Sequence, residues 1–418
     1  MKRYNLAIVG ATGAVGKEIL KVLAERNFPY GEIKMLASER SEGKKITFQD
    51  REYTVQKTGA DSFKNTDIAF FAGGSASKLY AHDAVKAGAI AVDNSSSFRY
   101  DPEVPLIVPE VNPEDVSWHK GIIANPNCST IQMVVALKPL HDAAKIKRIV
   151  ASTYQAVSGA GRDGIDELKN QVAQISRQEF AQGVRGAADK VAEGGTIVFN
   201  SIKKQAAKLA ETTAGSALKE QLNKIAESET MGEVRHHVAK IGQMDVVEDV
   251  KEQFSKFGQP AILKPQVFQY QIAFNVIPHI DAFQDNGYTK EEMKMVWETQ
   301  KMFHDDDLKI SVTTVRVPVF RSHSESINIE LEKSLSVDEA REILRNAPGV
   351  VVIDNVAENE YPMPLFASDT DQVYVGRIRE DISTDNGLSL WVVADQIRKG
   401  AATNAVQIAE LLVKDGLV

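Results

Sequence analysis

The sequence predicts an α/β fold in two domains, and three patterns in its 418 residues lead to that prediction. A short apolar strand, a glycine-rich turn and an amphipathic helix follow one another at the N-terminus. Buried strands then alternate with helices, which is typical of a parallel sheet. Strands in the C-terminal half alternate polar and apolar residues, which indicates a mostly antiparallel sheet with one buried face. We expect an N-terminal α/β domain over 1–128, completed by a helix within 386–418, and a C-terminal α+β domain over 129–385.

The composition is that of a globular protein, with 43% hydrophobic and 25% charged residues. The 49 Lys and Arg against 57 Asp and Glu give a formal charge of −8, so no basic excess is available to displace phosphate counterions and no nucleic-acid partner is expected. No apolar run is long enough to span a membrane, and Gly10 breaks the N-terminal run, which we interpret as a strand and not a signal peptide. One cysteine excludes an intramolecular disulfide and fits a cytoplasmic location.

The first turn is the strongest local motif. A strand at 5–9 ends at Gly10, and the spacing G-x-x-G-x-x-G then leads into a helix. Glycines let the backbone approach a pyrophosphate, and the helix N-terminus offers free N–H groups and a positive dipole end. We interpret this as a Rossmann-type dinucleotide site, although tight turns use glycines too. The candidate cofactor-binding residues here are Gly10, Thr12, Gly13, Ala14, Val15 and Gly16.

The second predicted strand, 33–37, ends at a polar turn that should select the cofactor. A carboxylate at this point, as Glu39 offers, would bind the ribose 2′-hydroxyl of NAD. Arg40 between Ser38 and Ser41 suits the 2′-phosphate of NADP better, because a guanidinium forms paired hydrogen bonds with phosphate. The sequence therefore favours NADP over NAD, with a solvated polar turn as the alternative.

Two further buried strands are predicted at 67–72 and 89–93, and polar or glycine-rich residues follow both of them. Ligands collect at these strand ends in open parallel sheets. Arg99 follows the second strand and its Asn/Ser loop. This position favours an anion-binding role over that of a surface cation.

The single cysteine, Cys128, follows a predicted strand at 122–124 and an Asn-Pro-Asn turn, and it opens an amphipathic helix. A helix N-terminus favours the thiolate, which predicts a nucleophile, whereas a lone cysteine is more often an inert hydrophobe. The nucleophile needs a base. Among the eight histidines, His323 lies in a hydroxyl-rich loop ahead of a predicted strand at 326–332, a better setting than the acidic run beside His304.

The C-terminal half supplies the remaining elements. A long alternating strand is predicted at 309–319, a helix at 337–345, and a final helix at 395–413 that packs back on the first domain. Residues 172–263 are rich in Ala, Lys, Glu and Gln, with apolar residues at helical spacing. We interpret them as a helical insertion. A surface insertion without a function is favoured slightly over a functional lid or an oligomer contact. The apolar positions with this spacing are Leu168, Val172 and Ile175, then Leu218, Leu222 and Ile225.

Taken in order, several segments resemble the aspartate-semialdehyde dehydrogenase family over about residues 1–171 and 264–418. They are Gly10–Gly16, Asn125–Thr130, Thr153–Gly161, Ile272–Asn275, Arg316–His323 and Gly400–Ala402. The resemblance implies an enzyme that reduces L-aspartyl 4-phosphate to L-aspartate 4-semialdehyde with NADPH, through a cysteine thioester that phosphate cleaves in reverse. This step belongs to lysine, diaminopimelate, threonine and methionine biosynthesis. In the family, one face of the second sheet forms a homodimer, so we expect a homodimer or a homotetramer.

The resemblance also implies roles at matching positions. Cys128 would be the acylated nucleophile and His323 the acid–base group that handles the thiol and hemithioacetal protons. Gln155 would orient the reacting group, while Asn127 and the Cys128 N–H would stabilise the oxyanion.

Four charged residues would bind the substrate. Arg316 would hold the α-carboxylate and Glu291 the α-ammonium, while Lys294 and Arg99 would bind phosphate. Four more residues would contact the cofactor, namely Ser158, Gly159, Gly161 and Gln396. Gln396 stands where many members have asparagine, and 172–263 has no match in the family pattern. No metal is implied.

Two other readings remain open at the level of sequence. An N-acetyl-glutamyl-phosphate reductase shares the glycine turn, the cysteine and the histidine, but its acetylated amine needs no ammonium partner such as Glu291. A non-catalytic NADP-binding sensor would be favoured by the loss of Cys128 or His323, and both are present.

Overall fold

The computed structural model describes residues 2–175 and 263–418, together with 203–204, 206–207, 216–230, 232–233, 236–237 and 240. The chain divides into two compact units, residues 1–165 with 274–418, and residues 166–273. The predicted domain boundaries at 128 and 386 both fall inside the first unit, where they stay predictions. Among the helices of the described residues, none is long and apolar enough to cross a membrane.

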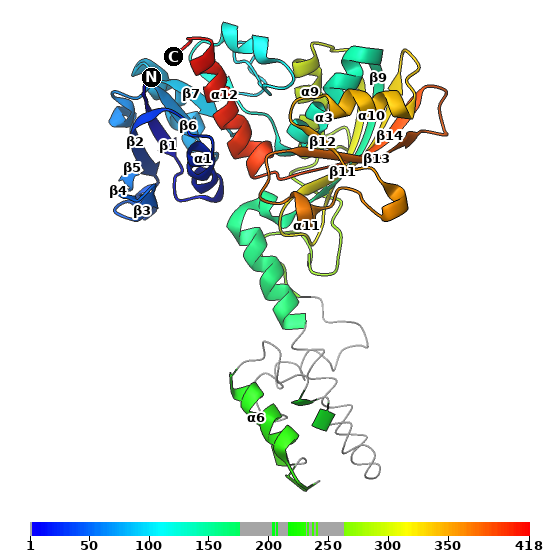
Figure 1. The fold of residues 1–418 in the computed structure, drawn as a ribbon. Coiled ribbons are helices and arrows are strands. Elements are labelled where there is room, and N and C mark those ends of the chain that lie inside the picture. The colour runs from blue at the N-terminus through cyan, green and yellow to red at the C-terminus, as the bar shows by residue number, and fades with distance from the viewer. Residues whose placement is uncertain are drawn as a thin grey trace. The chain divides into compact units, whose positions relative to one another are not determined.

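A six-stranded parallel sheet forms the N-terminal part of the first unit, in the order β5-β2-β1-β6-β7-β8 (Figure 1). Its strands are β1 (Tyr4–Val9), β2 (Tyr30–Ala37), β5 (Gln56–Lys57), β6 (Ile68–Phe71), β7 (Ile90–Asp93) and β8 (Ile122–Ala124). The strand order reverses between β1 and β6, and such sheets bind ligands beyond the carboxyl ends of their strands at this point. The predicted Rossmann-type domain is therefore confirmed.

Helices cover both faces of this sheet. Apolar residues of α1 (Ala14–Glu25) and α12 (Thr403–Lys414) pack on one face, and those of α2 (Ala76–Lys86) pack on the other. The C-terminal helix thus returns to the first domain as predicted (Figure 1). Its predicted start at 395 is wrong, because Asp395 Oδ1 accepts the N–H groups of Ile397 and Arg398 and one π-helical turn, η6 (Arg398–Ala402), precedes α12.

The second sheet is mixed, in the order β10-β9-β11-β14-β13-β12. Its strands are β9 (Ile146–Gln155), β10 (Lys309–Arg316), β11 (His323–Leu331), β12 (Val350–Val352), β13 (Val373–Glu380) and β14 (Gly387–Ala394). The inner pairings are antiparallel, as predicted, and the two edge pairings, β10 with β9 and β12 with β13, are parallel.

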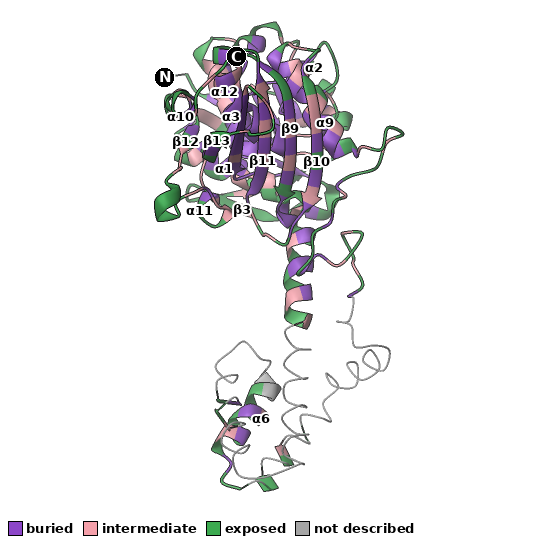
Figure 2. Ribbon diagram, turned by 90° about the vertical axis from the view of Figure 1, so that its right-hand side faces the viewer, coloured by how far each residue is buried: buried purple, intermediate pink, exposed green. Residues whose placement is uncertain are grey.

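The second sheet buries one face under three helices, α3 (Cys128–Ala144), α9 (Lys290–Phe303) and α10 (Val337–Arg345). The inner strands β11 and β14 are mostly buried, whereas β10 and β13 mix buried with exposed residues, and Figure 2 shows α9 and α10 beside the sheet. The predicted bounds of α10 are confirmed, whereas β10 ends three residues before the predicted 319, since Pro318 has no N–H to continue the ladder. β11 begins at His323, three residues earlier than predicted.

Smaller elements complete the described part of the first unit, and they were not predicted. They are the hairpin β3 (Lys45–Phe48) and β4 (Arg51–Thr54), the helix α11 (Pro364–Ala367), and the 3-10 turns η1 (Glu39–Ser41), η2 (Ala60–Phe63), η3 (Pro113–Trp118), η4 (Val157–Ala160) and η5 (Val356–Glu358).

The described part of the second unit contains a helix up to residue 175 and α6 (Ser216–Glu227), while its residues 263–273 form neither helix nor strand. Leu168, Leu222 and Ile225 are buried, as their helical spacing predicts. Gln171 Oε1 accepts the N–H groups of Ile272 and Ala273, both at 2.9 Å, so the two ends of this unit are joined. Most of the predicted insertion, and the side chain of Leu218, lie outside the described residues.

Candidate active site

Cys128 is the first residue of α3, and the residue before it caps the helix. Asn127 Oδ1 accepts the backbone N–H groups of Ser129 and Thr130 at 3.0 and 3.3 Å. This N-cap satisfies two of the donors that a helix start leaves without partners. The cysteine side chain is of intermediate exposure. The predicted placement of Cys128 at a helix start is therefore confirmed.

His323 faces the cysteine although the two residues lie far apart in the sequence. Its Nε2 is 3.5 Å from Cys128 Sγ, while its Nδ1 accepts the backbone N–H of Ala156 at 3.0 Å. Because a backbone N–H is always a donor, Nδ1 of the neutral ring must be unprotonated. The single ring proton therefore lies on Nε2, toward the sulfur.

The surroundings keep both members of this pair uncharged. Burial, helped by the charge of Glu291, raises the pKa of Cys128 to about 11, although Arg99, Arg316 and Lys294 act in the opposite direction. Burial and the charge of Arg316 hold the pKa of His323 well below its usual value. The helix N-terminus led us to expect a favoured thiolate, and in the free protein burial outweighs that effect.

Glu291 gathers the polar groups around the cysteine. Its Oε1 accepts from Asn127 Nδ2 at 3.0 Å and Gln155 Nε2 at 3.3 Å, and its Oε2 accepts from Lys294 Nζ at 3.0 Å. Lys294 also donates to Asp281 at 2.8 Å. Burial opposes both charges, but Lys294 lowers the pKa of Glu291, and Glu291 with Asp281 raises that of Lys294. Both residues keep their charges.

Arg316 ends β10 beside the histidine. Its Nη1 donates to Ala156 O at 2.7 Å. A Cβ added to Gly159 would lie 2.7 Å from that Nη1 and 3.4 Å from His323 Cε1. Glycine is thus required at this position of η4 by the close approach of Arg316 and His323. Gly161, with φ +80°, follows directly after η4.

Arg99 is buried and already paired. Its Nη1 donates to Glu298 Oε1 at 3.0 Å, and its Nη2 donates to Asn94 O at 3.0 Å. Glu298 was not predicted from the sequence. On α9, Glu298 lies seven positions after Glu291 and four after Lys294. This spacing places the three side chains on one helix face, and it is the sequence signal that could have identified Glu298.

The glycine-rich turn has the geometry that a dinucleotide needs. Gly10 has φ +88°, and a Cβ added to Gly16 would lie 2.3 Å from Gly10 O. Gly13 is the N-cap of α1 and makes no side-chain capping bond, so this helix start has N–H groups to offer a phosphate. Thr12 Oγ1 lies 3.4 Å from Ser41 Oγ, which brings the first turn beside the one that carries Arg40. Ser38, Arg40 and Ala14 are exposed around these turns, and Val15 is half-buried.

Gln396 joins two loops of the candidate site. Its Oε1 accepts the N–H of Ser322 at 2.7 Å, and its Nε2 donates to Ser158 Oγ. Ser322 has φ +71°, a strained conformation for serine, and directly precedes His323. The glutamine that departs from the family pattern is therefore buried between the histidine loop and η4.

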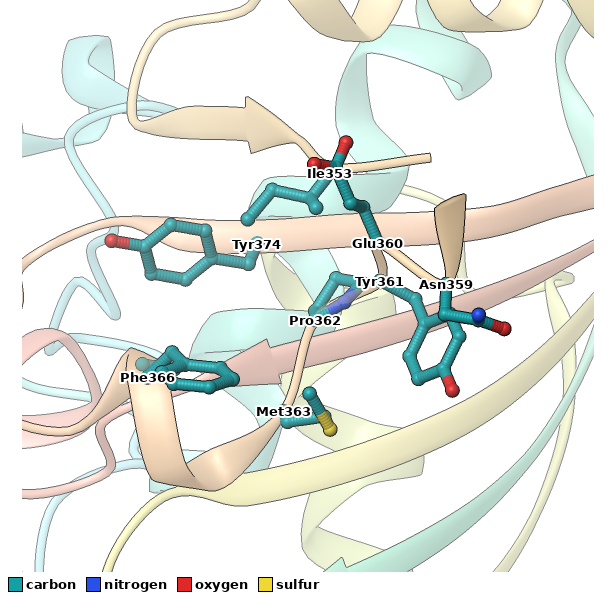
Figure 3. Close-up of a pocket in the computed structure, with 9 residues that line it drawn as sticks. Ile353, Asn359, Glu360, Tyr361, Pro362, Met363, Phe366 and Tyr374 are labelled. Carbon is teal, nitrogen blue, oxygen red and sulfur yellow. The ribbon is translucent and has the colours of Figure 1, made fainter. Parts of the chain in front are cut away.

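One recess lies apart from these residues (Figure 3). Its cavity of about 290 Å³ is lined by Ile353, Asn359, Glu360, Tyr361, Pro362, Met363, Phe366, Ala367 and Tyr374. Figure 3 shows that aromatic and aliphatic side chains provide most of the lining. No residue predicted for catalysis or cofactor binding belongs to it.

Glu325, two residues after His323, should make folding stability depend on pH. It is 0% exposed, and burial raises its pKa well above the usual value, although the Gln132 side chain acts in the opposite direction. The folded protein keeps this proton, whereas the unfolded chain releases it near pH 4.3. Stability should therefore fall as pH rises above that value, by up to about 1.4 kcal/mol per pH unit until the folded pKa is reached.

Glu325→Gln should remove this dependence. Urea unfolding between pH 5 and 8 should show the variant losing less stability than the wild type as pH rises. Glu330→Gln, on the same strand with its side chain 33% exposed and paired with Lys147 at 3.0 Å, is the matched control. Parallel pH curves for wild type and Glu325→Gln would contradict a protonated Glu325.

Comparison with known proteins covers the whole chain. Residues 5–119 match the family described as "Semialdehyde dehydrogenase, NAD binding domain", and residues 137–399 match "Semialdehyde dehydrogenase, dimerisation domain". The chain is 51% identical to aspartate-semialdehyde dehydrogenase of Aquifex aeolicus (strain VF5), with 99% of each chain covered. It is 42% identical to that of Bacillus subtilis (strain 168), again over 99% of each.

A solved structure of the same family has a similar fold. The crystal structure of aspartate semialdehyde dehydrogenase II from Vibrio cholerae, complexed with ASA, superposes with a TM-score of 0.77 at 42% identity, over 99% of each chain. The glycine turn of this chain falls within the matched nucleotide-binding domain, and the mixed sheet and His323 fall within the matched dimerisation domain. This chain belongs to the aspartate-semialdehyde dehydrogenase family.

Proposed function

We propose that this chain reduces L-aspartyl 4-phosphate with NADPH and a proton to L-aspartate 4-semialdehyde, NADP and phosphate, reversibly. The observation that carries the proposal is Cys128 Sγ at a helix start, 3.5 Å from His323 Nε2 and surrounded by charged groups of both signs. Relatives of high identity over the full length bear the name of this activity.

The sulfur chemistry starts on the acyl carbon. Cys128 sulfur bonds to that carbon and gives up its proton to the departing phosphate as the bond to the phosphate oxygen breaks, which leaves a thioester and releases phosphate. When bound, the nicotinamide cofactor supplies the hydride that reduces the thioester carbonyl. The negative charge then formed on the oxygen lies near Asn127 and the Cys128 N–H, which stabilise it. Breaking the carbon–sulfur bond frees the aldehyde and returns the thiolate, which takes up the proton of the net reaction to restore the thiol.

His323 handles the protons at its Nε2. In the free protein this nitrogen carries the ring proton and faces the sulfur. A second proton would have to enter at Nδ1 and break the hydrogen bond from Ala156 N–H, which keeps the imidazolium unfavourable. The histidine therefore donates a hydrogen bond from Nε2 to the thiolate as it forms, while the thiol proton leaves with the departing phosphate.

The substrate has three charged groups, and the site has a partner for each. Arg316 would hold the α-carboxylate with its planar guanidinium. Glu291, which keeps its negative charge, would meet the α-ammonium. Lys294 and Arg99 would bind the phosphate. An N-acetylated substrate would leave Glu291 without a cationic partner, which favours aspartate over acetyl-glutamate chemistry.

Arg40 should give the enzyme its preference for NADP. The matched family binds NAD-type nucleotides, and Arg40 is exposed beside Ser38 at the end of β2, where the ribose 2′ position would lie. Replacing it with Gln removes the charge that meets the 2′-phosphate, so KM for NADP should rise by about tenfold or more while KM for NAD stays within about twofold. Steady-state kinetics with both cofactors provide the measurement, and Arg51→Gln, on β4, is the control. Equal changes for both cofactors would contradict the assignment.

We also propose a homodimer formed through the face of the second sheet opposite α3, α9 and α10. The matched dimerisation domain supports association of this kind. The rings of Tyr154 and Trp391 lie tilted on this face with centroids 5.5 Å apart, and Tyr154 is 38% exposed and Trp391 half-buried. The apolar recess of Figure 3 lies at the same sheet. Sedimentation equilibrium at micromolar concentration should give twice the chain mass, and a monomer would overturn the proposal. A cytoplasmic location stays a prediction.

The assay that tests the activity follows NADPH absorbance. Aspartate semialdehyde with NADP should give a continuous increase that requires phosphate, because without phosphate each active site turns over only once. A far better turnover of N-acetyl-glutamate semialdehyde would overturn the assignment in favour of the acetylated substrate. Binding of NADP with no turnover of either aldehyde would favour the sensor interpretation instead.

A further inference from the structure

Glu298 holds two parts of the candidate site with one carboxylate. Its side chain is 0% exposed. Oε1 accepts from Arg99 Nη1 at 3.0 Å, and Oε2 accepts the backbone N–H of Asn127 at 2.5 Å. The first contact reaches the loop after β7, and the second reaches the peptide immediately before Cys128.

The rest of α9 binds the same loop. Lys301, three residues after Glu298, donates to the carbonyl oxygens of Arg99, Asp101 and Val104 at 3.0, 2.8 and 2.9 Å. Trp297 packs edge-on against Tyr100 with ring centroids 5.2 Å apart. These contacts fix the backbone that carries Arg99, while Glu298 alone among them also reaches the start of α3.

The Arg99 guanidinium is only partly satisfied. Its Nε is buried and, among the described residues, has no hydrogen-bond partner. Burial raises the pKa of Glu298, although Arg99 and the Asn127 N–H act against that rise. A buried arginine with an unsatisfied N–H is prepared for one further anion, and a phosphate oxygen would satisfy it.

We propose that Glu298 is a positioning residue, which fixes the Arg99 guanidinium relative to the Cys128 helix start so that phosphate is delivered to the thioester carbon. The inference rests on the proposed function, in which Arg99 binds phosphate. Glu298 itself does not touch the substrate. It acts through Arg99 on one side and through the Asn127 peptide on the other.

The test is Glu298→Gln, assayed in the phosphate-dependent direction. Glutamine offers a single carbonyl oxygen, so Arg99 and the Asn127 N–H compete for one acceptor. We expect KM for phosphate to rise by about tenfold, while KM for aspartate semialdehyde stays within about twofold. The burst of NADPH formed before phosphate is added should be retained, because Cys128 is intact.

Two comparisons separate positioning from a loss of stability. In a protein that already carries Arg99→Gln, adding Glu298→Gln should raise the phosphate KM by less than about twofold. The arginine that Glu298 positions is already absent there. Glu292→Gln is the matched control on the same helix. Glu292 accepts the N–H groups of Thr289 and Thr314 at 2.7 and 2.9 Å, so its loss should lower Tm and leave the phosphate KM unchanged.

An unchanged phosphate KM in folded Glu298→Gln would overturn the inference, as would a full additional effect in the Arg99→Gln background. If Glu298→Gln does not fold, Glu298→Asp keeps the charge at a shorter reach and must show the same selective rise in phosphate KM. A wild-type protein without phosphate-dependent NADPH formation would overturn the proposed function itself, which is a separate result.

Discussion

Cys128→Ala should lower kcat for phosphate-dependent NADPH formation by at least about 10⁴-fold, because the covalent route through the sulfur is lost. The side chain stands between α3 and η6, where a Cβ added to Gly400 would lie 2.9 Å from Cys128 Cβ. Truncation to alanine adds no atoms at this contact, so the fold should be kept. Stopped assays with high enzyme concentration can detect residual turnover at this level.

Mass spectrometry gives the control for the same variant. Wild-type protein incubated with aspartate semialdehyde and NADP, without phosphate, should gain the mass of one acyl group, and Cys128→Ala should not. NADP binding and Tm should match the wild type in the variant. Activity that survives in a correctly folded Cys128→Ala protein would contradict the thioester mechanism.

The local parts of the fold were predictable because short-range sequence determines them. The strand at 122–124, the Asn-Pro-Asn turn and the helix from Cys128 are adjacent in the chain, and the structure has them as predicted. The helix α10 also has its predicted bounds, since Ser336 caps it by accepting the N–H of Glu339 at 3.3 Å. Such caps are sequence-local signals.

The electrostatics of the site were not predictable in the same way. Helix position alone favours the Cys128 thiolate, whereas burial and the charge of Glu291 raise its pKa. Glu291 comes from a helix more than 160 positions further along the chain. Glu298, which no family motif marked, depends in the same way on α9 packing beside the turn before Cys128. These long-range contacts become visible only once the chain is folded.

His323→Asn should lower kcat by about 10²–10⁴-fold, the range expected when a positioned acid–base group is removed. Asparagine cannot place an N–H where Nε2 now lies, 3.5 Å from Cys128 Sγ, so neither the thiolate nor the hemithioacetal oxygen would find its proton partner. KM for phosphate should stay within about threefold, because Arg99 and Lys294 are untouched.

The reactivity of the Cys128 thiol depends on the hydrogen bond at His323 Nδ1. Ala156 N–H at Nδ1 keeps the ring neutral in the free protein, so the thiol should react slowly with iodoacetamide at neutral pH and faster as pH rises toward about 11, the raised pKa of Cys128.

The control for His323→Asn is His304→Asn, which changes an exposed histidine paired with Asp115 at 3.3 Å and should leave kcat unchanged. A His323→Asn protein with kcat within about threefold of the wild type would show that another group moves the proton. Because His323 is the histidine within reach of the sulfur among the described residues, that result would redirect the search to a proton donor carried by the substrate phosphate.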